Sequence, residues 1–347
     1  MRSFPGPPPS CTPNTSWRAL PVPQVDLTNA QQLNRMLARL YDQQLRDHVS
    51  TFSNMHQGRS NSARHLDDLF FRLVELSEPT VFAEAGAYKA EASRQIKRML
   101  PQCRVVAFEA NKYNFIAYSG LLKESAPGVE YLNCAVTDQP GEETFHLRRQ
   151  ADGQDMRQVT GNSSLLVRSD ESTTYEKFTV DAVSLDSYFP EVERSCIWID
   201  VEGASKQVLK GARHFLSSCQ VIKIEVEERM MWADQWLSLD VIAFMLAEGF
   251  VPIARDIEYE NQFNIVFVEN EFGRRPEVLA ATEYHGNYMA HHLASDRLDQ
   301  AEQSDEPPPR SDDGGSISDI GAGRPLTAAR SLLASVRTQL VRRARPR

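Results

Sequence analysis

The chain has 347 residues, a formal net charge of −9 at pH 7 and 41% hydrophobic residues. This length suits one large domain or two modest ones, with enough apolar residues for a substantial core. The acidic balance argues against a general nucleic-acid binder, which usually presents a basic face, so we expect no nucleic-acid partner.

The cysteines and the apolar runs predict a cytoplasmic protein. Five cysteines lie far apart, and their odd number and the lack of a CxxC pair indicate neither a disulfide framework nor a zinc site. Reduced thiols in a cytoplasmic protein are the favoured interpretation. No apolar run reaches membrane-spanning length, and the proline-rich start lacks the apolar stretch of a secretory signal.

Helices are predicted ahead of the main domain. Residues 1–28 are broken by repeated prolines and are predicted to be a disordered lead. Residues 29–80 form a predicted helical extension, because apolar residues recur at helical spacing over Gln31–Val49 and His65–Leu76. Pro79 ends the second helix or lies just beyond it.

Strands and helices alternate from residue 81 onward. Apolar runs predict strands at 80–86, 104–110 and 129–136, and the segments between them, Ala90–Leu100 and Tyr113–Lys123, are predicted helices. This βαβαβ order is typical of a parallel sheet with helices on both faces.

The alternation resumes after a less regular stretch at residues 137–172, in which residues 138–147 are predicted to form a turn and an exposed strand. Strands are predicted at 195–203 and 220–228, and helices at Ser205–Leu216 and Leu239–Glu248. Two last strands, near Pro252–Ile257 and Asn264–Val268, are expected to form an antiparallel pair at the edge. The predicted fold is therefore an α/β domain over residues 81–270, with a mostly parallel sheet and a terminal antiparallel hairpin.

Two tail segments follow the predicted domain. Residues 271–323 form a predicted acidic, disordered linker. Residues 324–347 carry seven arginines and no acid. They are either a loose tail whose charge offsets the linker, or a short amphipathic helix that contacts an anionic membrane surface or a protein. The thin apolar face, without Trp or Phe, favours the loose tail.

Candidate site residues follow the first two strands. Glu84 can accept hydrogen bonds from a cationic or hydroxylated ligand, and Gly86 lets the backbone approach a ligand closely. Glu109, 25 positions after Glu84, ends the second strand, where an acid suits hydrogen bonding to a ribose diol. A site for a dinucleotide or a nucleotide sugar is another possibility, but the glycines of the GxGxxG motif are missing.

A second group of acids ends the strand at 195–203. Asp200 and Glu202 are followed by glycine and a helix, so they either serve a site or cap the helix that begins near Ser205. Their place on the same sheet edge as Glu84 and Glu109 favours a site. Together with Glu225 they could hold a divalent cation. Helix capping and solvent exposure explain these acids nearly as well, so no metal is predicted.

With these residues in place, the chain resembles the FkbM-type family of S-adenosylmethionine-dependent methyltransferases. The resemblance covers about Val81 to Val268 and is strongest over IWIDVEGA (197–204) and VLKGA (208–212), which look like the family signature. Supporting stretches in matching order lie at 108–111, 135–138, 161–165 and 183–188. The resemblance implies a Rossmann-like class I methyltransferase fold and S-adenosyl-L-methionine as cofactor. It also implies O-methylation of a hydroxyl on a sugar, glycolipid or small natural product.

The resemblance also implies roles for individual residues. It places the methionine part of the cofactor at Glu84 and Gly86, with Ala87 and Tyr88 in the same turn, and the ribose at Glu109. The adenine would lie near Asn133 to Ala135. Asp200 would lie near the sulfonium and the acceptor, a small molecule or glycan, and Asp200 or Glu202 is expected to take the hydroxyl proton.

A second functional class stays open beside this one. The family's first motif usually reads DVGAN and continues to a further glycine, whereas Glu84, Tyr88 and Ala90 stand at the Asp, Asn and second Gly positions. The alternative is a non-catalytic binding or assembly module that keeps the methyltransferase-like fold with a degenerate cofactor motif.

Overall fold

The computed structural model describes residues 55–151, 153–169 and 172–286. Several predictions fall outside these residues: the disordered lead, the helix at 31–49, most of the acidic linker and the basic tail.

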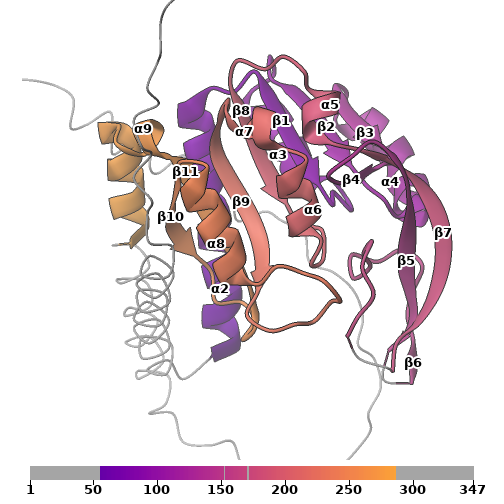
Figure 1. The fold of residues 1–347 in the computed structure, drawn as a ribbon. Helices are drawn as coiled ribbons and strands as arrows, with labels where there is room; N and C mark the ends of the chain where they lie inside the picture. Colours follow the sequence, from indigo (N-terminus) through magenta and orange to yellow (C-terminus); the bar gives the residue numbers. More distant parts are fainter. Residues whose placement is uncertain (1–54, 152, 170–171, 287–347) are drawn as a thin grey trace, which may run out of the picture. The chain divides into compact units, whose positions relative to one another are not determined.

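A seven-stranded sheet forms the centre of the fold, in the order β10-β11-β9-β8-β1-β2-β3 (Figure 1). The five strands from β3 to β9 are parallel, and β11 runs antiparallel to both β9 and β10. This sheet confirms the predicted fold class. Its strands are β1 (Val81–Ala85), β2 (Arg104–Phe108), β3 (Val129–Leu132), β8 (Ser195–Ile199), β9 (Cys219–Glu227), β10 (Phe250–Arg255) and β11 (Gln262–Glu269).

Helices cover both faces of this sheet (Figure 1). Side chains from α2, α3 and α9 pack on one face, and side chains from α5, α6, α7 and α8 pack on the other. The helices are α2 (Met55–Ser77), α3 (Glu91–Met99), α4 (Lys112–Ser125), α5 (Leu185–Tyr188), α6 (Ser205–Lys210), α7 (Arg213–Leu216), α8 (Ser238–Ala247) and α9 (Asn270–Gly273).

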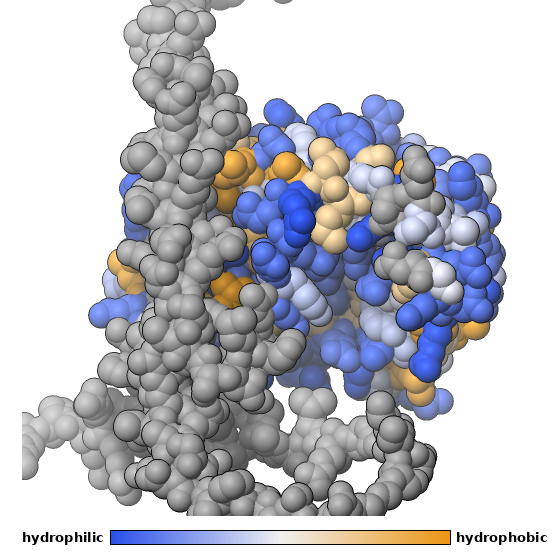
Figure 2. All heavy atoms as spheres, turned by 90° about the horizontal axis from the view of Figure 1, so that it is seen from below, coloured by the Kyte–Doolittle hydropathy of each residue, from blue (hydrophilic) through white to orange (hydrophobic). Residues whose placement is uncertain are grey.

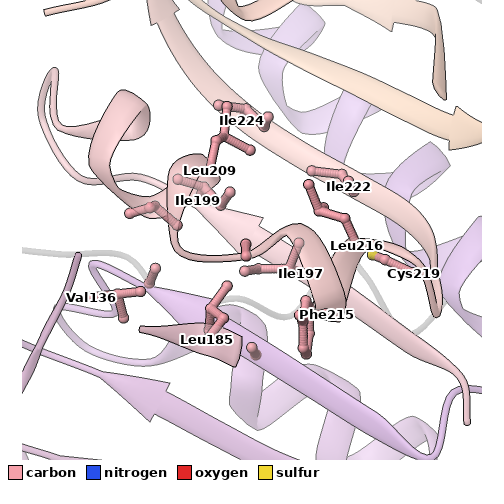
Figure 3. Close-up of a cluster of buried hydrophobic side chains, with 14 of the residues drawn as sticks. Val136, Leu185, Ile197, Ile199, Leu209, Phe215, Leu216, Cys219, Ile222 and Ile224 are labelled. Carbon is pink, nitrogen blue, oxygen red and sulfur yellow. The ribbon is translucent and has the colours of Figure 1, made fainter. Parts of the chain in front are cut away.

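Alternation along the central strands divides the core into two layers. On β8, Ile197 and Ile199 face the layer that contains α6 and α7, whereas Cys196 faces the layer that contains α2. Successive side chains of a strand point to opposite faces, so a strand covered on both sides is apolar at every position. Figure 3 shows part of the first layer, with Ile197, Ile222 and Phe215 among its side chains.

The helix α2 is part of this core. Leu66, Phe70 and Leu73 are fully buried, and they pack in the same cluster as side chains of β1, β2, β9 and β11. The predicted helix at 65–76 is therefore found, but it begins at Met55.

A smaller sheet in the order β4-β7-β5-β6 was not predicted. An exposed strand was expected within 138–147 and is found as part of β5, but no strand was expected at 174–183, because polar residues interrupt the apolar pattern there. The long antiparallel pair β5–β7 encloses a small apolar cluster of its own around Phe145 and Leu147. The strands are β4 (Ala135–Val136), β5 (Gly141–Ala151), β6 (Gln154–Asp155) and β7 (Thr174–Val183).

Three boundaries differ from the prediction. The predicted strand at 129–136 divides into β3 of the large sheet and β4 of the small sheet. The predicted helix Ser205–Leu216 breaks into α6 and α7 at Gly211, where a Cβ atom would lie 2.3 Å from the Thr137 carbonyl oxygen. Residues 271–286, predicted to begin a disordered linker, are largely helical, and Phe272 and Val278 bury their side chains in the core.

The surface of the described residues is mainly hydrophilic on the side that Figure 2 shows, with apolar side chains in separate small patches. Among the residues that the structure describes, no helix combines the length and the apolar character that crossing a bilayer requires.

Candidate functional site

A cavity of about 620 Å³ lies at the carboxyl ends of the parallel strands. The chain runs from β1 outward to β3 and then crosses to β8 on the other side of β1, so the strand order reverses between β1 and β8. Open parallel sheets bind ligands at such a switch point, and this volume is typical of a small-molecule site. Gly86, Tyr88, Glu109, Ala135, Asp200 and Glu202, all predicted site residues, line the cavity.

Gly86 allows the tips of β1 and β8 to meet. Its φ of 81° lies in the left-handed region, and a Cβ atom there would stand 1.7 Å from the Asp200 carbonyl oxygen. Because Asp200 also donates its backbone N–H to the Ala85 carbonyl at 2.9 Å, the two tips are held together. The glycine is thus required by the neighbouring strand, in addition to bordering the cavity.

Three predicted cofactor residues do not line the cavity. Glu84 is buried under the turn, where its Oε2 accepts the Ser93 N–H at 2.8 Å at the start of α3. Ala87 packs into a small apolar cluster with Ala107. Asn133 donates its Nδ2 to the Glu109 carbonyl at 2.9 Å. Each of these residues supports a residue or turn at the cavity wall.

Tyr88 is fixed through its backbone in a left-handed conformation, with φ of 45°. Its N–H donates to Glu109 Oε2 at 2.6 Å, and its carbonyl accepts the Tyr131 hydroxyl at 2.5 Å. Its ring packs edge-on against Tyr118, with the ring centroids 5.4 Å apart. Tyr88 is therefore part of the cavity wall, and the cavity persists beside it.

Glu109 closes the other side of this turn. Its Oε1 accepts the Asn111 N–H at 2.7 Å, while its Oε2 holds Tyr88. Burial raises the pKa of Glu109 to about 7, although both N–H groups oppose the shift. Each carboxylate oxygen has a second lone pair, so the group can still accept hydrogen bonds from ligand hydroxyls.

Asp200 and Glu202 carry the acidic end of the cavity. Both side chains are half-buried, and burial raises the pKa of Asp200, with Lys223 opposing the shift. Burial, followed by the like charges of Asp200 and Glu227, raises the pKa of Glu202 to about 8. Glu202 has a φ of 50°, a strained backbone for a residue other than glycine.

A loop over residues 158–165 covers the cavity between these two ends. Asn111 Nδ2 donates to the Gln158 carbonyl at 2.9 Å, and Asn114 exchanges two hydrogen bonds with the Thr160 backbone at 2.9 and 3.0 Å. At the other end, Ser164 Oγ donates to the Val201 carbonyl at 3.3 Å. The loop, which includes the predicted motif stretch at 161–165, thus ties α4 to the tip of β8.

Several residues that line the cavity were not predicted from the sequence. Lys223 gives one signal, a single cation inside an apolar strand run, and it pairs with Asp67 of α2. Arg148 and Asn264 also line the cavity but give none, because their positions depend on strand pairings that lack a readable code.

The sheet order, with a cavity at its switch point, is that of the Rossmann-like class I methyltransferase fold. The model of the methyltransferase FkbM domain family matches residues 81–252 of this chain. No curated protein matches the chain significantly.

Several solved structures with a similar course of the chain are described as methyltransferases. A precorrin-6Y C5,15-methyltransferase from Geobacter metallireducens has 16% identity and a TM-score of 0.30, over 57% of this chain and 86% of the other. An rRNA methylase from Streptococcus thermophilus has 10% identity and a TM-score of 0.34, over 60% and 96%. Human N-acetylserotonin methyltransferase in complex with SAM has 7% identity and a TM-score of 0.30, over 58% and 51%. At such low identities and TM-scores, these likenesses say nothing about the substrate.

Proposed function

We propose that this protein is an S-adenosyl-L-methionine-dependent methyltransferase that O-methylates a hydroxyl of a sugar, glycolipid or small natural product. The observation that carries the proposal is the meeting of Gly86, Glu109 and Asp200 around one cavity at the switch point of a family methyltransferase domain.

The proposed cofactor end of the cavity is the turn around Gly86 together with Glu109. Glu109 accepts the ribose hydroxyls through the lone pairs that Tyr88 and Asn111 leave free. The turn at Gly86 lies against the backbone of Asp200, so a methionine part bound there has its sulfonium close to the acidic end. The loop at 158–165 excludes water from this region.

The proposed reaction needs alignment and one proton acceptor. When bound, the cofactor supplies the methyl group: its sulfur keeps the electron pair of the S–CH₃ bond while the acceptor oxygen forms the new C–O bond. Asp200 or Glu202 takes the hydroxyl proton, because both line the cavity beyond the turn at Gly86. Holding the two reactants in line is the larger contribution of the protein.

The alternative proposal is a non-catalytic module with a degenerate cofactor motif. Tyr88 and Ala90 motivate it, since they replace the family's Asn and second Gly. The position of Tyr88 favours the enzyme, because its ring packs on Tyr118 and its backbone N–H still donates to Glu109. Ala90 reaches the left-handed region, with φ of 51°, without a glycine.

The proposal is tested with S-adenosyl-L-methionine that carries an isotopically labelled methyl group. The full-length protein is incubated with it and with panels of sugars, glycolipids and hydroxylated natural products, and labelled products are detected by mass spectrometry. We expect label on an oxygen of one acceptor class, with loss of transfer in Asp200→Ala. Cofactor binding without transfer to any panel would favour the non-catalytic module.

A further inference from the structure

Acidic side chains from two neighbouring strands, β8 and β9, gather at one end of the cavity. Asp200 follows β8, Glu202 lies in the turn after it, and Glu225 lies near the end of β9. One carboxylate oxygen from each of the three residues lies within 4.8 Å of the other two. One oxygen atom from each acid therefore lies close to a common point.

The sheet register adds an amide to this cluster. Ile199 pairs with Ile224, so Asp200 and Glu225 follow in the same row, and Glu225 pairs with Asn264 of β11. The row thus carries an aspartate, a glutamate and an asparagine on three adjacent strands. Glu202 has a left-handed backbone, which costs energy for a residue other than glycine. This conformation lies in the turn that follows β8.

Unpartnered buried oxygen atoms are an independent sign of a ligand. Glu227, two residues after Glu225 on the same face of β9, is fully buried. Its Oε2 accepts a hydrogen bond from Gln235 at 3.1 Å, but its Oε1 has no hydrogen-bond partner among the described residues. The same holds for Oε1 of Glu225 and Oδ1 of Asn264, whose Nδ2 donates to Asp256 at 2.9 Å. Two of these three acceptors belong to residues that line the cavity, Glu225 and Asn264, and acceptors without donors there indicate a bound group that is positive or donates hydrogen bonds.

The nearby cations act on these acids unequally and leave Glu225 without a compensating charge. Lys223 opposes the raised pKa of Asp200, but it also pairs with Asp67 and lies 3.4 Å from the centre of the Trp198 ring. Arg148 and Arg168 act on Glu202, and Arg168 also acts on Glu227. No lysine or arginine is among the main influences on the pKa of Glu225. Burial, followed by the like charges of its acidic neighbours, raises this pKa well above the usual range. Buried carboxylates are costly unless a cation compensates them.

We propose that Asp200, Glu202 and Glu225 bind a divalent metal ion, with Asn264 Oδ1 as a further oxygen donor. Carboxylate and amide oxygens are the ligands of Mg²⁺, Mn²⁺ and Ca²⁺. These ions hold oxygens at about 2.0–2.6 Å, so oxygens on opposite sides of the ion are about 4–5 Å apart. The 4.8 Å limit on the three carboxylate oxygens meets this requirement.

The bound ion positions the methyl acceptor in the cavity. Each carboxylate contributes one oxygen to the ion and keeps the other for hydrogen bonding. A hydroxyl bound to the ion loses its proton more readily and is held in a fixed direction. This role rests on the proposed methyl transfer, whereas metal binding itself does not.

The test uses the full-length protein freed of metal with a chelator and kept without S-adenosyl-L-methionine. MgCl₂, MnCl₂ and CaCl₂ are titrated separately, with heat of binding and thermal unfolding as readouts. We expect one saturable site for at least one of the three ions and a midpoint of unfolding that rises with its concentration. No saturable binding of any of them would overturn the proposal.

Two variants locate the site. Glu225→Gln is expected to weaken metal affinity about tenfold or more, and to unfold at the same or a higher temperature without metal, since it removes a like charge. Glu228→Gln, an exposed acid just beyond β9, serves as the matched control and keeps wild-type affinity. Equal affinities in the two variants would contradict the site.

The experiment also separates the metal from an organic cation and from the proposed reaction. If a simple amine such as ethanolamine stabilises the protein and the metal ions do not, the site binds an ammonium group and the metal proposal is wrong. A separate titration with S-adenosyl-L-methionine tests the cofactor. Metal binding without cofactor binding would overturn the proposed function and leave the metal site standing.

Discussion

At the residue scale, Gly86 shows how one position serves the fold and the site together. The sequence pattern predicted close approach of a ligand at this glycine, and Gly86 lines the cavity. The structure shows that this position requires glycine, because the Asp200 carbonyl occupies the space that a Cβ atom would take. A pattern along one strand does not show which backbone lies beside it, so this requirement could not be predicted.

Replacing Gly86 is expected to destabilise the fold strongly. Gly86→Ala combines a left-handed backbone with overlap against Asp200, at a cost of at least about 3 kcal/mol in the free energy of unfolding. Gly120→Ala is the control: Gly120 lies within α4 with no atom near its missing Cβ, and we expect a gain of about 0.5–1 kcal/mol. Urea denaturation of both variants measures the difference. A Gly86→Ala protein as stable as Gly120→Ala would show that β1 and β8 do not meet as described.

Glu84 carries a pH dependence of stability. Burial raises its pKa to about 7, while its hydrogen bonds with Ser93 oppose the shift. The folded protein therefore holds this proton more tightly than the unfolded chain, and stability is lost as the pH rises from about 4.5 to about 7. Glu84→Gln keeps an acceptor for Ser93 and cannot ionise. Relative to wild type, it should gain up to roughly 3 kcal/mol between pH 5 and pH 8.

Denaturation series at pH 5, 6, 7 and 8 check this prediction. Glu124→Gln, at an exposed acid on α4, is the control and should follow wild type at every pH. A constant difference between Glu84→Gln and wild type over this range would be inconsistent with a raised pKa.

At the element scale, the strands and helices of the large sheet were predictable because their patterns are local. Apolar runs gave β1, β2, β8 and β9, and helical spacing gave α2 to α4. The sheet β4-β7-β5-β6 was missed, since its strands are half-exposed and acquire their apolar side only when β5 and β7 pair. The acidic tips of β8 and β9 were found for the same reason that the strands were: they end apolar runs.

A partly buried ion pair joins α2 to the sheet. Lys223 of β9, 3% exposed, pairs with Asp67 of α2. Lys223→Met leaves Asp67 without its cation and is expected to cost about 3 kcal/mol in the free energy of unfolding. The double variant Asp67→Asn/Lys223→Met should cost less than the sum of the single changes by at least about 1 kcal/mol.

A double-mutant cycle by chemical denaturation measures this coupling. The exposed pair Arg72 and Glu75 on α2 provides the comparison, with an expected coupling below about 0.5 kcal/mol. Additive effects at Asp67 and Lys223 would mean that α2 is held by its apolar face alone.

At the scale of the whole molecule, the described domain brings together residues that are far apart in the chain. The cavity takes side chains from α2, from the ends of four parallel strands and from the loop at 158–165. The sequence predicted the strand ends, since parallel strands share an edge. It did not predict Arg148, Lys223 or Asn264, whose places depend on the second sheet, the α2 contact and the β9–β11 register.

The central claim is that this cavity binds S-adenosyl-L-methionine through Glu109. Isothermal titration of the full-length protein with the cofactor tests it most directly. We expect one site with a dissociation constant in the micromolar range. Glu109→Gln should bind about tenfold or more weakly, and Glu124→Gln, an exposed acid on α4, should bind like wild type. Absence of binding by the wild-type protein, or equal affinity in Glu109→Gln, would contradict the account.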